Sequence, residues 1–141
     1  MDIQAALDVL GNPIEKFEAR TPTSVSLPFT DLRGARLNGA HLHDANLICA
    51  HLDRANLQGA DLAAAFLWSA HLEGAHLAGA RLKDAHLNSA DLRNSVDLTQ
   101  QQINSACGDK YTALPAGLTP PESWNNIWYC SRPNITGTSC E

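Results

Sequence analysis

The chain has 141 residues, with 10 Lys and Arg against 15 Asp and Glu, and a formal net charge of −5. This acidic surplus argues against a nucleic-acid-binding protein, since such proteins usually carry a basic surplus. The sequence lacks an apolar run of about 18 residues, so no transmembrane helix is expected. The first residues contain early acids and no basic stretch, which is not typical of a signal peptide.

Residues 1–24 precede the regular part of the sequence. Within residues 3–10 the apolar side chains follow the spacing of an amphipathic helix, which Asp2 can cap and Gly11 can end. We expect this helix to cap the neighbouring domain or to cover one of its faces. Residues 11–24 contain two prolines and are predicted to form an irregular connector.

Residues 25–94 are fourteen consecutive five-residue units, each with Leu at its centre, from Leu27 to Leu92. Ala stands two positions before Leu in twelve of them, the exceptions being Val25 and Thr30. On an α-helix each step of five would rotate the leucine by roughly 140°, and on a strand successive leucines would alternate between faces. All the leucines share one interior only if the chain turns by a constant angle at each unit. The repeat therefore predicts a solenoid.

The A-(D/N)-L-x-x pattern of these units resembles the bacterial pentapeptide-repeat family. The resemblance covers residues 25–94. It implies an all-β solenoid, a right-handed quadrilateral β-helix in which four units make one square coil. Fourteen units then make about three and a half coils, in a rod whose coils are spaced like paired strands.

Square coils place every fourth unit on the same face, so that outward side chains form columns. We number the faces by their leucines: face one carries Leu32, Leu52, Leu72 and Leu92, face two Leu37, Leu57 and Leu77, face three Leu42, Leu62 and Leu82, and face four Leu27, Leu47, Leu67 and Leu87. On face one the position before Leu carries Asp31, His51, His71 and Asp91, and the position after Leu carries Arg33, Asp53, Glu73 and Arg93. These two columns are partly complementary in charge, as cross-strand pairs are.

Face one also contains weak candidates for a metal site. His51 and His71 could bind a metal with Asp31 or Asp91 completing the site. A solvated polar face is the simpler interpretation, and exposed pairs of this kind contribute little to stability.

Face four is the apolar face of the expected coil. The apolar side chains predicted to point outward there or at its adjoining corner are Pro28, Ile48, Phe66, Trp68, Phe29 and Cys49. A patch of this kind on a soluble protein is usually covered or used. Two interpretations stay open: a flanking segment of the chain lies over Ile48, Phe66 and Trp68, or these residues form a docking or dimer surface.

Residues 95–108 are predicted to cap the C-terminal end of the solenoid. The repeat register slips after Asn94, since the next leucine, Leu98, comes one residue late. Thr99 to Gln102 form a T-x-x-Q capping box, which predicts a short helix ending near Ala106. Residues 98–124 also resemble the segment that follows the repeats in many bacterial members of the family.

Residues 109–141 are predicted to form an irregular tail pinned to the rod by aromatic side chains. The cysteines towards this end are Cys107, Cys130 and Cys140. A Cys130–Cys140 disulfide would close a short loop and Cys107–Cys130 is the alternative, between which the spacing does not choose. Cys49 is expected to be a free thiol. A disulfide would indicate an extracytoplasmic protein; without one, the cytoplasm is slightly favoured.

The sequence predicts a non-catalytic protein. It contains no Gly-x-Ser-x-Gly, His-Glu-x-x-His or phosphate-loop motif, and a rod filled with Leu and Ala offers no concave pocket. Neither a cofactor nor direct nucleic-acid binding is expected. We predict a structural or protein-interaction module that docks an unidentified protein, or a second copy, through a flat face. The resemblance implies one alternative: some family members mimic DNA and bind DNA gyrase, although those rods are longer and strongly acidic.

Overall fold

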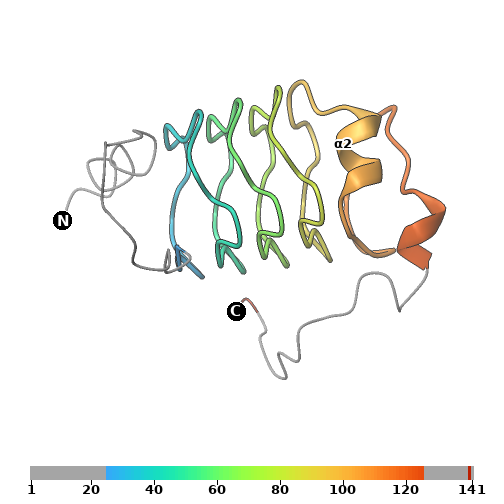
Figure 1. The fold of residues 1–141 in the computed structure, drawn as a ribbon, viewed down its shortest axis with the longest axis horizontal. Coiled ribbons are helices and arrows are strands. Elements are labelled where there is room, and N and C mark those ends of the chain that lie inside the picture. The colour runs from blue at the N-terminus through green and yellow to red at the C-terminus, as the bar shows by residue number, and fades with distance from the viewer. Residues whose placement is uncertain (1–24, 126–139, 141) are drawn as a thin grey trace, which may run out of the picture.

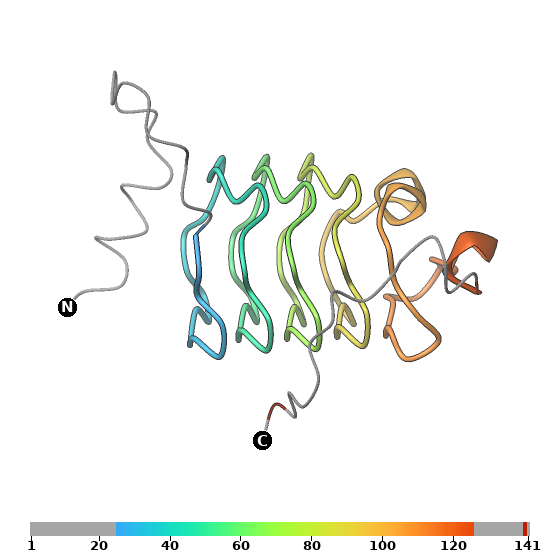
Figure 2. The same ribbon diagram turned by 60° about the horizontal axis from the view of Figure 1, so that its bottom comes forward.

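The computed structural model describes residues 25–125 and 140. The helix and connector predicted within residues 1–24 lie outside the described residues. Figure 1 shows the described chain as a stack of coils wound along one axis, with helix α2 (Gln100–Ser105) at the C-terminal end and the short 3-10 helix η1 (Glu122–Asn125) beyond it. Figure 2 shows the same stack from another side. No helix in the described part of the chain is long and apolar enough to cross a membrane.

Isolated parallel β-bridges join the coils, and up to Val96 each bridge links the residue before one Leu to the residue twenty positions later. The four columns of bridges begin Ser26–Asn46–Phe66–His86, Asp31–His51–His71–Asp91, Arg36–Asn56–His76–Val96 and His41–Asp61–Arg81. The twenty-residue coil expected from the sequence is therefore confirmed. At each bridge one residue serves as donor and acceptor: the N–H of Asn46 donates to the carbonyl of Val25 at 2.8 Å, and its carbonyl accepts from Leu27 at 2.7 Å.

A tight turn closes every corner of the coil. The second residue after each of the fourteen leucines has a positive φ, between 51° and 67°. From Leu32 to Leu92 the following N–H donates back to the leucine carbonyl, as from Ala50 to Leu47 at 3.1 Å. A positive φ at this position is the requirement of a type II turn. Gly meets it without cost, as at Gly34, whereas a side chain such as that of Arg54 is held in the left-handed region at a cost of roughly 1–2 kcal/mol.

Asp and Asn recur before Leu because their side chains complete the same turn. The carboxylate of Asp61 accepts a hydrogen bond from the N–H of Ala63 at 3.2 Å, and the amide oxygen of Asn56 accepts one from Gln58 at 3.1 Å. Short side chains with an acceptor oxygen form such Asx turns readily. This position therefore tolerates histidine but prefers Asp or Asn for a local reason.

The interior is filled by the leucines and by the alanines two positions before them. In the second and third coils these leucines are at most 2% exposed. Leu and Ala form one continuous core along the rod, close-packed as protein interiors are. The core fixes the coil geometry and leaves all other positions of the unit at the surface.

The register is kept one residue further than the sequence suggested. Val96 still pairs with His76 at a separation of twenty, and the extra residue is Asp97, which has a φ of 59°. Thr99 caps α2, and the Thr99–Gln102 capping box is present with both of its hydrogen bonds. The Gln102 side chain also donates to the carbonyls of Leu77 and Ala80, which fastens α2 to the preceding coil.

Residues beyond α2 build part of a further coil, which the sequence analysis did not anticipate. Cys107 bridges His86 at a separation of 21 residues and Ala113 bridges Asp91 at 22, so the segment expected to be an irregular tail from residue 109 re-enters the ladder. The Asp109 carboxylate accepts hydrogen bonds from the Ser89 N–H and hydroxyl, in place of the backbone carbonyl that accepts from the equivalent N–H in earlier coils, as Asn88 does from Ser69. The added residues are accommodated in α2 and in the loop before Ala113.

Trp124 closes the C-terminal end of the core. Its ring is 6% exposed, and its indole N–H donates to the carbonyl of Ala106 at 2.8 Å. The ring lies against Gly108, where an added Cβ would meet it at 2.7 Å. An open solenoid end would expose core side chains, and Trp124 supplies the apolar surface that covers them.

Replacing Leu57 by Ala should lower the free energy of unfolding by about 2–5 kcal/mol, because the fully buried side chain leaves a cavity in a core with little freedom to collapse. Chemical denaturation measures this loss. The matched control is Gln58→Ala, one residue away and exposed, which should change stability by less than about 0.5 kcal/mol. Equal losses in the two variants would contradict the packing described here.

Candidate interaction surface

Faces one to three are exposed in the structure and face four is not. The side chains that flank the leucines on faces one, two and three are mostly exposed or half-buried, whereas Ile48 and Trp68 on face four are 6% and 8% exposed. The exposed polar faces one to three are therefore the first candidates for a surface that contacts a partner.

Face one carries two arginine–aspartate ion pairs, one in its first row and one in its last row within residues 25–94. Arg33 binds both carboxylate oxygens of Asp31 at 2.8 and 2.6 Å, and Arg93 binds both oxygens of Asp91 at 2.9 and 2.6 Å. The hydrogen bonds from Arg33 lower the pKa of Asp31 to about 2, and those from Arg93 lower the pKa of Asp91. Each pair lies within one coil, so these arginines do not bridge to the acids of neighbouring coils.

The two middle coils of face one carry histidine beside an acid. The rings of His51 and His71 stack in parallel, with centroids 4.5 Å apart and planes 8° apart. The Nδ1 atom of His51 lies 3.8 Å from a carboxylate oxygen of Asp53, and Glu73 accepts a hydrogen bond from the Asn94 side chain at 3.1 Å. Within residues 25–94 face one therefore presents four rows, each of which carries an acid together with an arginine or a histidine.

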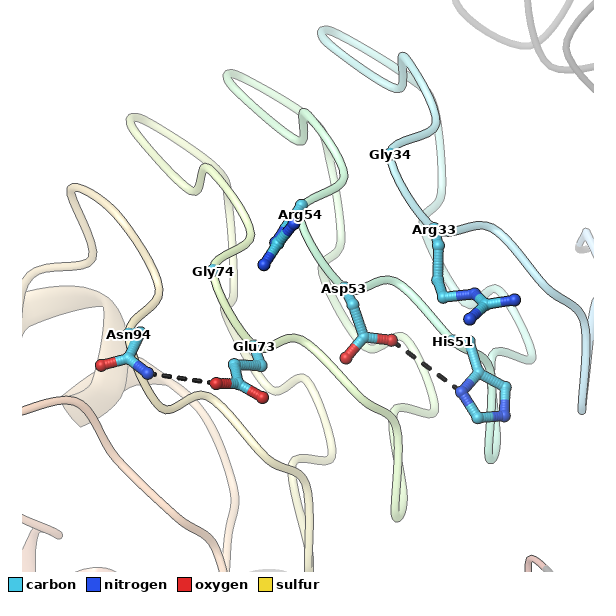
Figure 3. A pocket seen from close by; sticks show the side chains of 8 residues that line it. All are labelled: Arg33, Gly34, His51, Asp53, Arg54, Glu73, Gly74 and Asn94. Carbon is cyan, nitrogen blue, oxygen red and sulfur yellow. Dashed lines mark hydrogen bonds and ion pairs between the residues drawn. The ribbon is translucent and has the colours of Figure 1, made fainter.

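A shallow groove of about 770 Å³ runs along the corner between faces one and two (Figure 3). It is lined by Arg33, Gly34, His51, Asp53, Arg54, Glu73, Gly74 and Asn94. Gly34 and Gly74 leave the corner without a side chain on both sides of Arg54. A Cβ at Gly74 would stand 3.3 Å from Cγ of Arg54. The sequence analysis missed this groove, although glycine at every second corner of the column was a readable signal.

The geometry does not bring the weak metal candidates together as ligands. The lone pairs of ring nitrogens lie in the ring plane, so in two parallel stacked rings they cannot converge on one ion. Among residues 25–125 and 140 there is no group of three or more His, Cys, Asp or Glu side chains placed to hold a metal. The sequence predicted no metal site, with His51 and His71 as weak candidates only, and that prediction stays untested.

Face four forms a second, smaller apolar cluster outside the leucine core. Ile48, Cys49 and Trp68 are buried in it and Phe66 packs against it partly buried. This burial is consistent with a covered face, and docking through Ile48, Phe66 and Trp68 stays a prediction. Phe29, which precedes Cys49 in the same corner column, remains 52% exposed, so the burial does not extend along the whole corner.

A disulfide between Cys49 and Cys140 links the C-terminal end of the chain to this cluster, with Cα atoms 5.5 Å apart. The prediction of a free thiol at Cys49 was therefore wrong, and so was the pairing of Cys140 with Cys130. Cys107 is also disulfide-bonded; Cys130, its suggested partner, lies outside the described residues. Spacing along the chain could not reveal the observed bond, because the fold alone brings residues 91 positions apart into contact.

His86 belongs to the same face. Its ring stacks on Phe66 with centroids 5.2 Å apart and meets Trp68 edge-on at 6.4 Å. Burial lowers the pKa of His86 below its usual value, an effect that the Asp84 carboxylate opposes more weakly. The ring therefore acts here as a flat neutral group that extends the apolar cluster.

Loss of the Cys49–Cys140 bond should destabilise the fold, since the bond closes a loop 91 residues long. We expect Cys140→Ser to lower the free energy of unfolding by about 2–4 kcal/mol, measured by chemical denaturation. The double variant with Cys49→Ala should lose little more than either single variant, because both changes remove the same bond. Additive losses would contradict the assignment.

The burial of His86 should make stability fall in mild acid. Above the ordinary histidine value of 6.5 the ring is neutral in the folded and unfolded chains. Below it the unfolded chain takes up the proton first, because the folded pKa is lowered, and stability is lost. Unfolding free energies measured from neutral to mildly acidic pH should therefore fall less in His86→Asn than in the parent. His76→Asn, which changes an exposed residue at the same repeat position, is the control; an equal effect from it would contradict this account.

Comparison with known proteins agrees with this geometry. The pentapeptide-repeat family matches residues 29–62 and 55–94, in eight copies. The chain is similar to the pentapeptide-repeat protein Rfr23 of the cyanobacterium Cyanothece 51142, with 28% identity over 69% of this chain and 67% of that one and a TM-score of 0.58. It is also similar to HetL of Nostoc sp. PCC 7120, a protein involved in heterocyst differentiation regulation, with 33% identity over 69% of this chain but only 41% of HetL and a TM-score of 0.51.

No curated protein matches the chain. Its likeness to the solved structures implies a right-handed quadrilateral β-helix. The five-residue repeat, the twenty-residue ladder and these matches lead to one conclusion: the chain belongs to the pentapeptide-repeat protein family.

Proposed function

We propose that this chain is a non-catalytic protein-interaction module, a rigid β-helical rod that docks a protein partner through an exposed flat face. The observation that carries the proposal is the fixed spacing of outward side chains on faces one to three. A bridge at nearly every coil and a core of fully buried leucines hold these columns in place. A partner that matches the spacing can bind with little loss of side-chain and backbone freedom, which is the main cost of association.

The family supports a role of this kind. Pentapeptide-repeat proteins are generally structural rather than catalytic. The similar protein HetL is involved in heterocyst differentiation regulation, a role that a protein-binding rod could serve. The hollow described along the corner between faces one and two is an open groove on the surface, whereas catalytic sites usually require an enclosed concave pocket.

The disulfide suggests where the partner should be sought. Cysteines paired between a coil corner and the C-terminal end of the chain are typical of proteins that mature in oxidising compartments. A partner outside the cytoplasm is therefore the first one to test. For the DNA-gyrase alternative, which requires strongly acidic faces, the described residues offer no support, because each exposed face carries basic side chains: Arg33 and Arg93 on face one, Arg36 on face two, and Arg81 and Lys83 on face three.

Site-specific photo-crosslinking in the source cells tests the proposal. A photoreactive phenylalanine analogue is placed singly at Arg33 on face one, Asn38 on face two and Lys83 on face three, all of which are exposed. We expect one face to give a crosslink to a defined protein and the other two to give none. Absence of crosslinks from all three positions, or equal crosslinking of abundant proteins from each, would contradict the proposal.

A further inference from the structure

Face one differs from the other exposed faces in being complementary to itself. Its four rows read Asp31 with Arg33, His51 with Asp53, His71 with Glu73 and Asp91 with Arg93. In every row one of the two outward positions carries an acid. The other carries an arginine of opposite charge or a histidine that can donate a hydrogen bond. Figure 3 shows Arg33, His51, Asp53 and Glu73 projecting from successive coils on this side of the rod.

We propose that face one binds face one of a second copy of this chain, around a two-fold axis parallel to the rod. The inference rests on the proposed function and names the partner. Rotation about such an axis, placed between the two columns, exchanges left and right and leaves the height along the rod unchanged. The column before Leu on one copy then faces the column after Leu on the other, coil for coil. Because the contact is isologous, the assembly closes as a dimer.

Each row then forms a reciprocal contact. Asp31 of each copy faces Arg33 of the other, and Asp91 faces Arg93 in the same way. Within one chain these residues are already joined by two-pronged hydrogen bonds, which leave further guanidinium N–H groups and carboxylate lone pairs unused. The end rows would become rings of four alternating charges, and networks of this kind stabilise better than isolated exposed pairs.

The middle rows add histidine–carboxylate contacts to the long His51–Asp53 pair and the Asn94–Glu73 hydrogen bond of the monomer. Asp53 and Glu73 stand on adjacent coils of one column, where like charges side by side are unfavourable, and Arg33 and Arg93 are held by other acids. In the dimer the stacked rings of His51 and His71 meet these two carboxylates of the second copy. A histidine N–H donates to a carboxylate whether or not the ring carries a proton.

Other arrangements and faces do not give the same match. A two-fold axis perpendicular to the rod would reverse the coil order and place Asp31 against Asp91 and Arg33 against Arg93. On face three the first row pairs His41 with His43 and the third pairs Arg81 with Lys83, so self-association there would oppose like charges. Face two has one charged side chain in its first row, Arg36, and face four is buried.

The interface is small, which sets the expected strength. Four coils at the spacing of paired strands give a face roughly 15–20 Å tall. The surface area that such a face can bury is smaller than that of a standard stable interface. We therefore expect a reversible dimer that forms at high protein concentration. It should weaken by about tenfold or more from low to high salt, because its contacts are charged.

Charge exchange tests the proposal on the full disulfide-bonded chain. In the acidic variant, Arg33→Asp with Arg93→Asp, both end rows become wholly acidic; in the basic variant, Asp31→Arg with Asp91→Arg, they become wholly basic. Sedimentation velocity over a dilution series should find a dimer for the parent chain and monomers for each variant alone. An equimolar mixture of the two variants should dimerise again, because the end rows are then complementary between copies.

A control variant exchanges the two columns by making all four substitutions in one chain. It keeps the composition and the self-complementarity, so it should dimerise like the parent chain. Circular dichroism and thermal unfolding check that every variant is folded. A parent chain that stays monomeric at all concentrations would overturn the dimer, and so would a dimer that survives in the acidic or basic variant. Neither result touches the proposed docking of another protein, which the crosslinking experiment decides separately.

Discussion

The fold depends on the requirement that the chain turn a right-angled corner every five residues. Each corner needs a residue with a positive φ, observed between 51° and 67°, and a returning hydrogen bond such as that from Ala55 to Leu52 at 3.0 Å. Leucine then fills the square interior and alanine leaves room for it. Because every coil repeats the same solution, the positions before and after each leucine are held at fixed places on the surface without being needed in the core.

Because the core and the surface use different positions of the unit, faces built from one repeat can differ greatly in their side-chain chemistry. Arg54 and Gly74 occupy equivalent corners, yet one carries a guanidinium and the other leaves a hollow beside it. Face one has become a set of charged rows, whereas face four has become an apolar cluster around Ile48 and Trp68. The backbone conformation does not depend on which side chains occupy the outward positions, so the surface can be varied for recognition while the core remains constant.

The C-terminal end of the described rod is built differently from its middle. At the C-terminal end α2 replaces one extended segment, Cys107 and Ala113 continue the ladder with one and two extra residues respectively, and Trp124 covers the last layer. The Cys49–Cys140 bond then ties the C-terminal end of the chain back to the second coil. These contacts use irregular segments, which a repeating core cannot stabilise by itself, and they depend on hydrogen bonds and a covalent link instead.

The sequence by itself determined the coil, its twenty-residue register and the columns of face one, because leucine spacing and turn chemistry act locally and repeat fourteen times. It also located the capping box at Thr99 and Gln102, which depends on residues three apart. Only the tertiary structure decided the partner of Cys49, the burial of Trp68 and the return of Ala113 to the ladder. Each of these joins segments distant in the chain, where neither spacing nor propensity specifies a contact and the packed fold alone brings the groups together.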